Sequence, residues 1–179
     1  MNISFVIEDK KGKNILFVTD SGEALTLSEA ITLAAVLVDE YLRMGLGDWL
    51  DWAAKIGIET SIGIGQIKAE TARNLIKEGL YNPDPENEQL KPKNIHKISK
   101  AHLYSYLKEP VHSANLSAAK IRYDINRWAP FVDVSNLPNI LGTLYSQGDI
   151  PVHGNPMPDE NRGSQIGTEF YFLAKEAFK

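Results

Sequence analysis

The sequence of 179 residues predicts a mainly α-helical (α+β) protein with a small β-hairpin at its N-terminus. Apolar residues recur at helical spacing through most of the chain, and Ser, Thr or Asp stands before several of these stretches as an N-cap. Runs of β-forming residues occur only before residue 20. No long flexible linker divides the chain. We therefore expect a single domain over 1–179, with 1–25 as a β-hairpin appendage and 26–179 as the helical part.

Two short strands and a long helix are expected first. The strands cover residues 3–7 and 14–19, on either side of a polar turn. Thr26 and Glu29 then have the spacing of a capping box, in which each side chain bonds the backbone N–H of the other. The helix that follows is apolar on more than one side, which predicts a central position, and Gly45 ends it.

An aromatic, amphipathic helix is expected after Asp48. Trp49, Trp52 and Ile56 lie at helical spacing, and Glu59 falls three residues after Ile56 on the same face. The pattern therefore predicts that the Glu59 carboxyl group points toward the interior.

The remaining segments predict five more helices. Glycines interrupt the pattern after Glu59, and Gln66 or Ile67 opens a helix that Gly79 ends. Residues 81–92 are polar and contain prolines, so we expect a surface loop there. The later helices have predicted starts at Ser99, Ser113 and Asn136-Leu-Pro-Asn139, and the last one, after a loop over 149–163, places Phe170, Leu173, Ala174 and Ala177 on one face.

Composition excludes several classes of protein. The net charge is −4 and no run of Lys or Arg is dense, so we expect no nucleic-acid partner. The absence of cysteine excludes disulfides, thiolate metal sites and cysteine catalysis. No apolar run approaches the ~20 residues of a membrane span. The N-terminus lacks the basic start and apolar stretch of a signal peptide.

Glu59 is the candidate proton donor. Burial beside Trp52 and Ile56 would raise its pKa, and so would the negative end of its helix. A carboxyl group that stays protonated near neutral pH can give a proton to a glycosidic oxygen. The competing interpretation is a surface glutamate at a helix end. Gly63 and Gly65 permit close backbone approach, and the amide of Gln66 suits an N-acetyl group, although a tight turn and a helix cap would also explain them.

Three segments together resemble the lytic transglycosylases of the lysozyme-like superfamily. The chain has Glu59-Thr-Ser61, then Gly63-Ile-Gly-Gln-Ile67 and Thr71-Ala72, where the family has Glu-Ser, Gly-Leu-Met-Gln and often Thr-Ala. Asn115-Leu-Ser-Ala-Ala-Lys-Ile121 is similar to the family's Asn-Ile helix. Leu141-Gly-Thr-Leu-Tyr-Ser-Gln-Gly148 is similar to its Ala-Tyr-Asn-Ala-Gly element. The order is also the family's order, over about residues 48–148.

The resemblance implies a lysozyme-like fold, with 26–179 as the catalytic part, and cleavage of the β-1,4 bond between N-acetylmuramic acid and N-acetylglucosamine in peptidoglycan. Glu59 would be the general acid and then the general base. The Gly65 backbone and Gln66 would hold the acetamido group, with Thr60 and Ser61 also on the substrate side. The resemblance implies no metal or other cofactor. A further residue, Tyr145, would pack on a sugar or fix the acid, or else be a core tyrosine.

A second carboxylate would decide between hydrolysis and the transglycosylase route. Hydrolysis needs a partner about 5–9.5 Å from the acid. Glu70, Asp124 and Asp133 are candidates, but Glu70 is explained by its place in a first helical turn and the two aspartates are expected at the surface. We therefore favour the single-acid route, in which the 6-hydroxyl group of N-acetylmuramic acid attacks its own anomeric carbon.

Two other functions stay open. A metal-dependent cell-wall amidase would need ligands from His96, His102, His112 and His153, none of which has i, i+4 spacing and most of which we expect to be solvated. A non-catalytic glycan-binding or interaction module on the same fold is the second. A wall-degrading enzyme without a signal peptide suggests an antibacterial effector exported by a secretion system, or phage lysis. An effector would also have an immunity protein as a partner.

Overall fold

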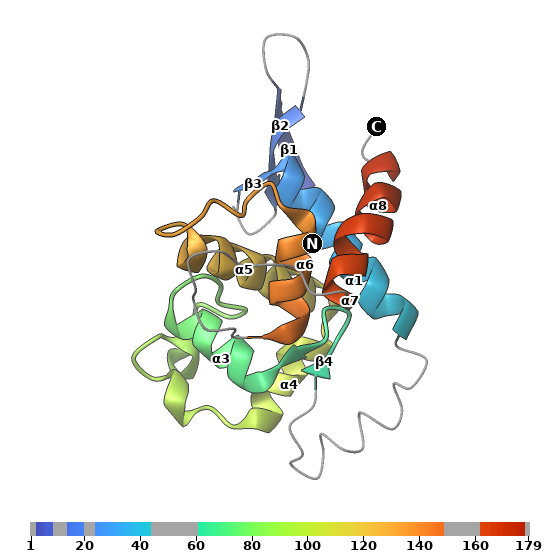
Figure 1. Cartoon of the computed structure of the whole chain (residues 1–179). Coiled ribbons are helices and arrows are strands. Elements are labelled where there is room, and N and C mark those ends of the chain that lie inside the picture. The colour runs from blue at the N-terminus through green and yellow to red at the C-terminus, as the bar shows by residue number, and fades with distance from the viewer. Residues whose placement is uncertain (1–2, 9–13, 20–23, 44–60, 149–161, 178–179) are drawn as a thin grey trace. The chain divides into compact units, whose positions relative to one another are not determined.

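The computed structural model describes residues 3–8, 14–19, 24–43, 61–148 and 162–177 (Figure 1). These residues are mainly helical with short strands, which confirms the predicted fold class. The chain contacts divide the protein into two compact units, Met1–Asp39 with Asp124–Lys179, and Glu40–Tyr123. The expectation of a single domain stays a prediction. No helix among the described residues is both long enough and apolar enough to cross a membrane.

A three-stranded antiparallel sheet opens the first unit. Strands β1 (Ile3–Glu8) and β2 (Asn14–Thr19) form the predicted hairpin, with Val6 opposite Phe17. A third strand, β3 (Ala24–Thr26), pairs with β2 on its other edge. Three residues are too few to show a strand periodicity, so the sequence did not indicate this strand.

Helix α1 (Leu27–Arg43) begins with the predicted capping box. The Thr26 N–H donates to Glu29 Oε2 at 2.8 Å, and the Glu29 N–H donates to Thr26 Oγ1 at 3.3 Å. Both bonds occupy backbone donors that have no partner inside the helix. The buried apolar residues of α1 confirm that it belongs to the core of its unit: Ala30, Ile31, Leu33, Ala35 and Val36.

Two consecutive helical segments pack on α6 (Pro138–Gln147) in the same unit. They are α7 (Arg162–Gln165) and the π-helical turn η4 (Ile166–Phe170), and α8 (Tyr171–Ala177) continues from η4 (Figure 1). Helix α6 starts with proline in its first turn and ends before Gly148, as the sequence predicted. Its inner face is filled by large side chains, among them Ile140, Leu141 and Leu144.

Glycines allow this close helix packing. A Cβ atom on Gly167 would lie 2.1 Å from the Cα of Asn139, and one on Gly163 would lie 2.2 Å from the Cα of Thr143. Gly142 on α6 faces Gly163 in the same way, because a Cβ atom there would lie 2.3 Å from the Gly163 carbonyl oxygen. Backbones approach each other here more closely than any side chain permits.

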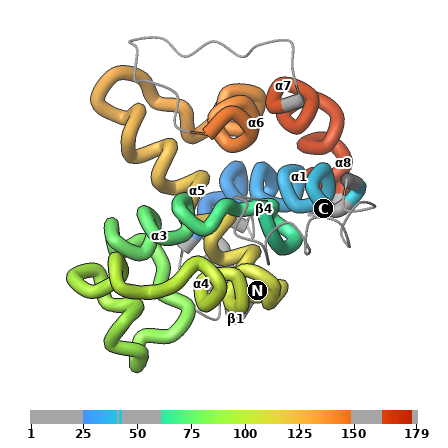
Figure 2. Tube along the Cα trace, turned by 90° about the horizontal axis from the view of Figure 1, so that it is seen from below, coloured from blue at the N-terminus to red at the C-terminus, as the bar shows by residue number. Residues whose placement is uncertain are grey.

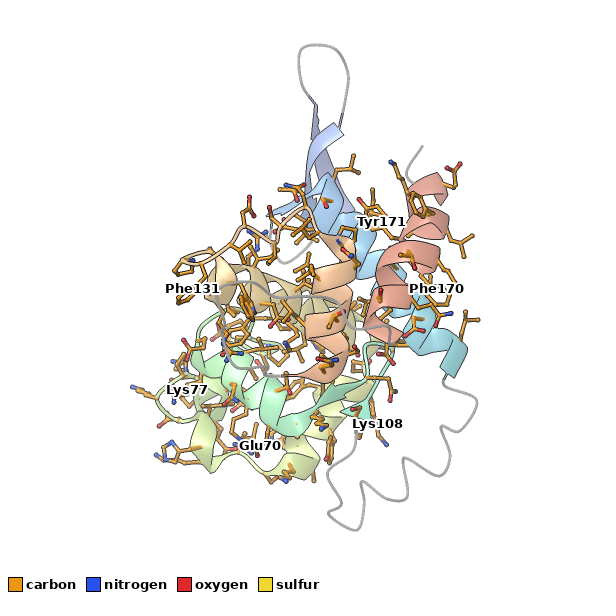
Figure 3. All side chains as sticks on the ribbon, in the orientation of Figure 1. Glu70, Lys77, Lys108, Phe131, Phe170 and Tyr171 are labelled. Carbon is orange, nitrogen blue, oxygen red and sulfur yellow. The ribbon has the colours of Figure 1, made fainter. Side chains whose placement is uncertain are left out.

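The final helix differs from its prediction. Ala174 is buried, but Leu173 is 63% exposed and Phe170 is only half-buried. The π-helical turn is the reason, because it places more residues in a turn than an α-helix does and so rotates the following face. Figure 3 labels Phe170 and Tyr171, where η4 passes into α8.

The second unit contains a short hairpin that the sequence analysis did not predict. Strand β4 (Ser61–Ile62) pairs with β5 (Ile67–Lys68), and helix α3 (Ala69–Lys77) follows directly. The helix was expected to open at Gln66 or Ile67, and the two strand residues displace its start. Its buried face contains Ala72 and Leu75, and Gly79 ends it, as predicted, with φ +71°.

The predicted surface loop over 81–92 contains one short helix, and a second follows it. Two 3-10 helices, η2 (Glu88–Leu90) and η3 (Ile95–Lys97), bury Leu90 and Ile95. The guanidinium group of Arg73 on α3 donates to the carbonyl oxygens of Ile95 and Ile98, at 2.5 and 3.1 Å. This side chain therefore ties residues 95–98 to α3.

Helix α4 (Lys100–Lys108) packs against α3 in this unit (Figure 2), and α5 (Pro110–Trp128) follows, with its residues up to Tyr123 in the same unit. Ser99 caps α4, as predicted, by accepting from the His102 N–H at 3.2 Å. The predicted N-cap at Ser113 is wrong. Helix α5 already begins at Pro110, because proline suits a first turn in which its missing N–H is not needed.

Candidate functional site

The candidate site is a four-residue loop, Gly63 to Gln66, that joins β4 and β5. The Gln66 N–H donates to the Gly63 carbonyl at 3.0 Å and closes a β-turn. Gly63 has φ +76° and Gln66 has φ +48°, so both lie in the left-handed region. The last residue of the loop, Gln66, therefore has left-handed backbone at a position where glycine is usual.

Gln66 is the one non-glycine residue with positive φ in the part of the chain that the structure describes. For a residue with a Cβ atom this conformation costs about 1–2 kcal/mol. Part of this cost is offset, because the side-chain Nε2 donates to the Gly63 carbonyl at 2.9 Å. No described residue donates to the amide oxygen of Gln66. Its Oε1 is thus the atom suited to accept a hydrogen bond from a ligand.

The loop is held from behind by Ser113 of α5. The Gly65 N–H donates to the Ser113 Oγ at 3.1 Å, and this serine is fully buried. A Cβ atom on Gly63 would lie 2.0 Å from the carbonyl oxygen of Leu107 and 2.4 Å from the Ser113 Oγ. Glycine is therefore required at position 63 both by φ and by space.

The sequence predicted only a capping role for Ser113, and the contact with Gly65 was missed. The bond joins positions 48 residues apart, so local pattern could not show it. One signal was present, since Ser113 and Ser117 are small residues four apart on a helix. Such a face permits close approach of another segment of backbone.

The predicted site residues are brought together only in part. Ser61, Gly65 and Gln66 lie on one hairpin, with Ser61 half-buried at the start of β4. Tyr145 is buried on α6 and belongs to the other compact unit. The predicted acid, Glu59, lies outside the described residues, as do Thr60, the aromatic helix expected after Asp48 and His153.

Two of the three carboxylates considered as a catalytic partner of Glu59 have contacts among the described residues. Glu70 lies in the first turn of α3 (Figure 3), 3.3 Å from the Arg73 Nε. Hydrogen bonds from the hydroxyl and the backbone N–H of Ser135 lower the pKa of Asp133, which keeps this carboxyl group ionised. Asp124 was expected at the surface, and this is wrong, because it is only 1% exposed.

A hydrogen-bonded cluster of aromatic and polar side chains lies elsewhere in the unit that contains the loop 63–66. The Tyr81 hydroxyl lies 2.8 Å from His112 Nδ1 and accepts from Asn115 Nδ2 at 3.2 Å. Tyr106 stands edge-on to the His112 ring and donates to Asp84 at 3.1 Å. His112 is thus half-buried, unlike the exposed His96 and His102. His112 and Asn115 share a helix face, which follows only once α5 is known to start at Pro110.

Comparison of the chain with protein-family models, with curated proteins and with solved structures gives no match. Within the described residues, no three His, Cys, Asp or Glu side chains are grouped so that they could hold a metal ion.

Proposed function

We propose that the protein cleaves the β-1,4 bond between N-acetylmuramic acid and N-acetylglucosamine in bacterial peptidoglycan, with Glu59 as general acid and base. The proposal rests on the residue motifs that resemble the lytic transglycosylases and on one structural observation. Gln66, which matches the glutamine of the family's motif, has a strained left-handed backbone on a loop that a buried serine holds in place. Strained residues of this kind concentrate at ligand-binding and catalytic sites.

The hydrogen bonds of the loop suggest how an acetamido group would bind. Nε2 of Gln66 is used inside the loop, so its Oε1 is the proposed acceptor for the acetamido N–H. The resemblance implies that the Gly65 backbone holds the sugar, but the Gly65 N–H is donated to Ser113. The proposed role of Gly65 is therefore to let the sugar approach the backbone closely. From the resemblance alone, Thr60, Ser61 and Tyr145 are also proposed to contact the substrate.

We favour a mechanism that uses one carboxyl group. Glu59 would protonate the glycosidic oxygen as the bond to the anomeric carbon breaks. The 6-hydroxyl group of N-acetylmuramic acid would attack that carbon and give its proton back to Glu59, which leaves a 1,6-anhydro sugar. The ion pair of Glu70 with Arg73 supports this route, because it accounts for that carboxylate without catalysis.

The biological setting follows from the proposed activity. The partner would be the glycan strands of peptidoglycan. The protein would reach them by export through a secretion system, or it would act as a phage lysis enzyme. As an antibacterial effector, the protein would also have an immunity protein that blocks its site.

Clearing of purified sacculi tests the proposal. We expect the native chain to lower the turbidity, and mass spectrometry to find products that end in anhydro-muramic acid. Reducing ends would indicate a muramidase instead. Glu59→Gln should reduce the rate by at least about 100-fold, because general acid catalysis contributes about 10²–10⁴-fold. Glu78→Gln changes an exposed glutamate at the end of α3 and serves as the matched control.

Three results would contradict the proposal. Glu59→Gln with full activity and an unchanged melting temperature would remove the proposed acid. Binding of sacculi without any cleavage would favour the glycan-binding module. Cleavage that EDTA abolishes, with release of peptides, would favour the metal-dependent amidase.

A further inference from the structure

Two buried serines on one face of α5 have different hydrogen-bond partners. Ser113 and Ser117 are four residues apart and both are fully buried. The Ser117 hydroxyl donates to the Ser113 carbonyl at 2.9 Å, which is a bond inside its own helix. The Ser113 hydroxyl accepts from the Gly65 N–H of a distant hairpin. Of these bonds, only that of Ser113 fixes another segment of the chain to α5.

The loop that Ser113 holds has no room to move toward α4 or α5. Gly63 lies against the Leu107 carbonyl at the end of α4 and against Ser113 itself, so closely that a Cβ atom would meet both. The Gly65 N–H is buried and has its partner at 3.1 Å. A buried N–H without a partner is costly, so the bond favours a single position of the loop.

The position of Gln66 follows from these contacts. Gln66 is bonded to Gly63 through both its N–H and its Nε2, at 3.0 and 2.9 Å, and it directly follows Gly65. A shift of the loop away from Ser113 would therefore move the Gln66 amide with it. An error of about 1 Å in a positioned group can cost about 100-fold in rate.

We propose that Ser113 is a positioning residue that sets the preference of the site for N-acetylated sugars. It contacts no sugar itself and acts by holding Gly65, and through it the Gln66 amide that accepts from the acetamido N–H. This inference rests on the proposed cleavage of peptidoglycan for its substrate. The hydrogen bond from Gly65 to Ser113 is a separate claim that stands without it.

The first experiment measures amide hydrogen exchange of Gly65 by NMR in the full chain. Ser113→Ala should lower the protection of the Gly65 amide by about fivefold to tenfold, as loss of one net hydrogen bond of about 1 kcal/mol implies. Ser117→Ala, matched in size and burial, should leave it within about twofold. Equal protection of Gly65 in the two variants would overturn the proposal.

The second experiment compares cleavage of native sacculi with cleavage of chemically de-N-acetylated sacculi. The native chain and Ser117→Ala should prefer the N-acetylated polymer. Ser113→Ala should lose at least about fivefold of this preference, mainly through a higher KM for the N-acetylated polymer. An unchanged ratio in Ser113→Ala would refute the positioning role, because a purely structural loss would slow both substrates alike.

The two experiments separate the possible failures. If the native chain cleaves neither polymer, the proposed function fails and the specificity assigned to Ser113 fails with it. Gly65 exchange then still decides whether Ser113 holds the loop. Far-UV circular dichroism and thermal unfolding of both variants confirm that each is folded, and Ser113→Cys, which keeps a weak acceptor, should give intermediate Gly65 protection.

Discussion

Replacement of Gly63 by alanine tests the packing of the loop most directly. A matched control exists in Gly79, which has nearly the same backbone angle, φ +71° against +76°. A Cβ atom at position 79 would have nothing within 4 Å, whereas one at position 63 would lie 2.0 Å from the Leu107 carbonyl oxygen. The two substitutions therefore share the cost of the left-handed backbone and differ only in the steric conflict.

The magnitudes of these costs can be compared. Left-handed backbone costs an alanine about 1–2 kcal/mol, so Gly79→Ala should lower the free energy of unfolding by about that much. At position 63 the atom in the way is backbone, which cannot rotate aside. Overpacking adds about 1–3 kcal/mol. A shift that breaks the bond from Gly65 to Ser113 adds a further ~1–3 kcal/mol, because the N–H is buried.

We therefore expect Gly63→Ala to lose about 2–6 kcal/mol more than Gly79→Ala. Urea unfolding followed by circular dichroism measures both values, from the midpoint and the slope of each curve. Equal midpoints for the two variants would refute the close contact of Gly63 with α4 and α5. The same result would also remove the structural basis for the role of Ser113.

Three further predictions concern other described residues. Gln66→Gly should keep or slightly raise the melting temperature, because relief of the left-handed strain of ~1–2 kcal/mol offsets the loss of one side-chain hydrogen bond. The same variant should abolish cleavage of sacculi, and retained cleavage would contradict the role of the Gln66 amide. Gly167→Ala should lower the free energy of unfolding by about 1–3 kcal/mol through overpacking against Asn139. Thr168→Ala, on the exposed side, should lower it by less than about 0.5 kcal/mol. Similar losses for the two variants would show that η4 and α6 do not touch at Gly167. NMR titration should give Asp133 a pKa below the usual ~3.9. The stability that this carboxylate contributes is then present above pH ~3.9 and is lost as the pH falls through the lowered pKa, and Asp133→Asn should weaken this dependence of stability on pH. A normal pKa would contradict the two hydrogen bonds from Ser135.

Local signals in the sequence predicted several of the helix boundaries that the structure describes. The capping box at Thr26 and Glu29, the cap at Ser99 and the glycine stop at Gly79 are all present in the structure. These features succeed because each depends on residues within one turn, where a side chain and the backbone meet whatever the rest of the fold does. The mainly helical class follows from the same signals.

Elements that depend on tertiary contacts were predicted less well. The strands β4 and β5 have two residues each, too few for a pattern, and exist because they pair with each other. The exposure of Leu173 follows from a π-helical turn, which a regular 3.6-residue period cannot foresee. The burial of Asp124 is likewise a property of the folded chain.

For the candidate site, the sequence by itself determined that two glycines and a glutamine stand in one short loop before a helix, which is enough to suggest a ligand-binding turn. Only the tertiary structure decided that Gln66 has left-handed backbone and that the Gly65 N–H is donated to Ser113. The physical reason is distance along the chain. Caps and turns are set by neighbours, whereas the position of this loop is set by a helix face that begins nearly fifty residues later and reaches it only after folding.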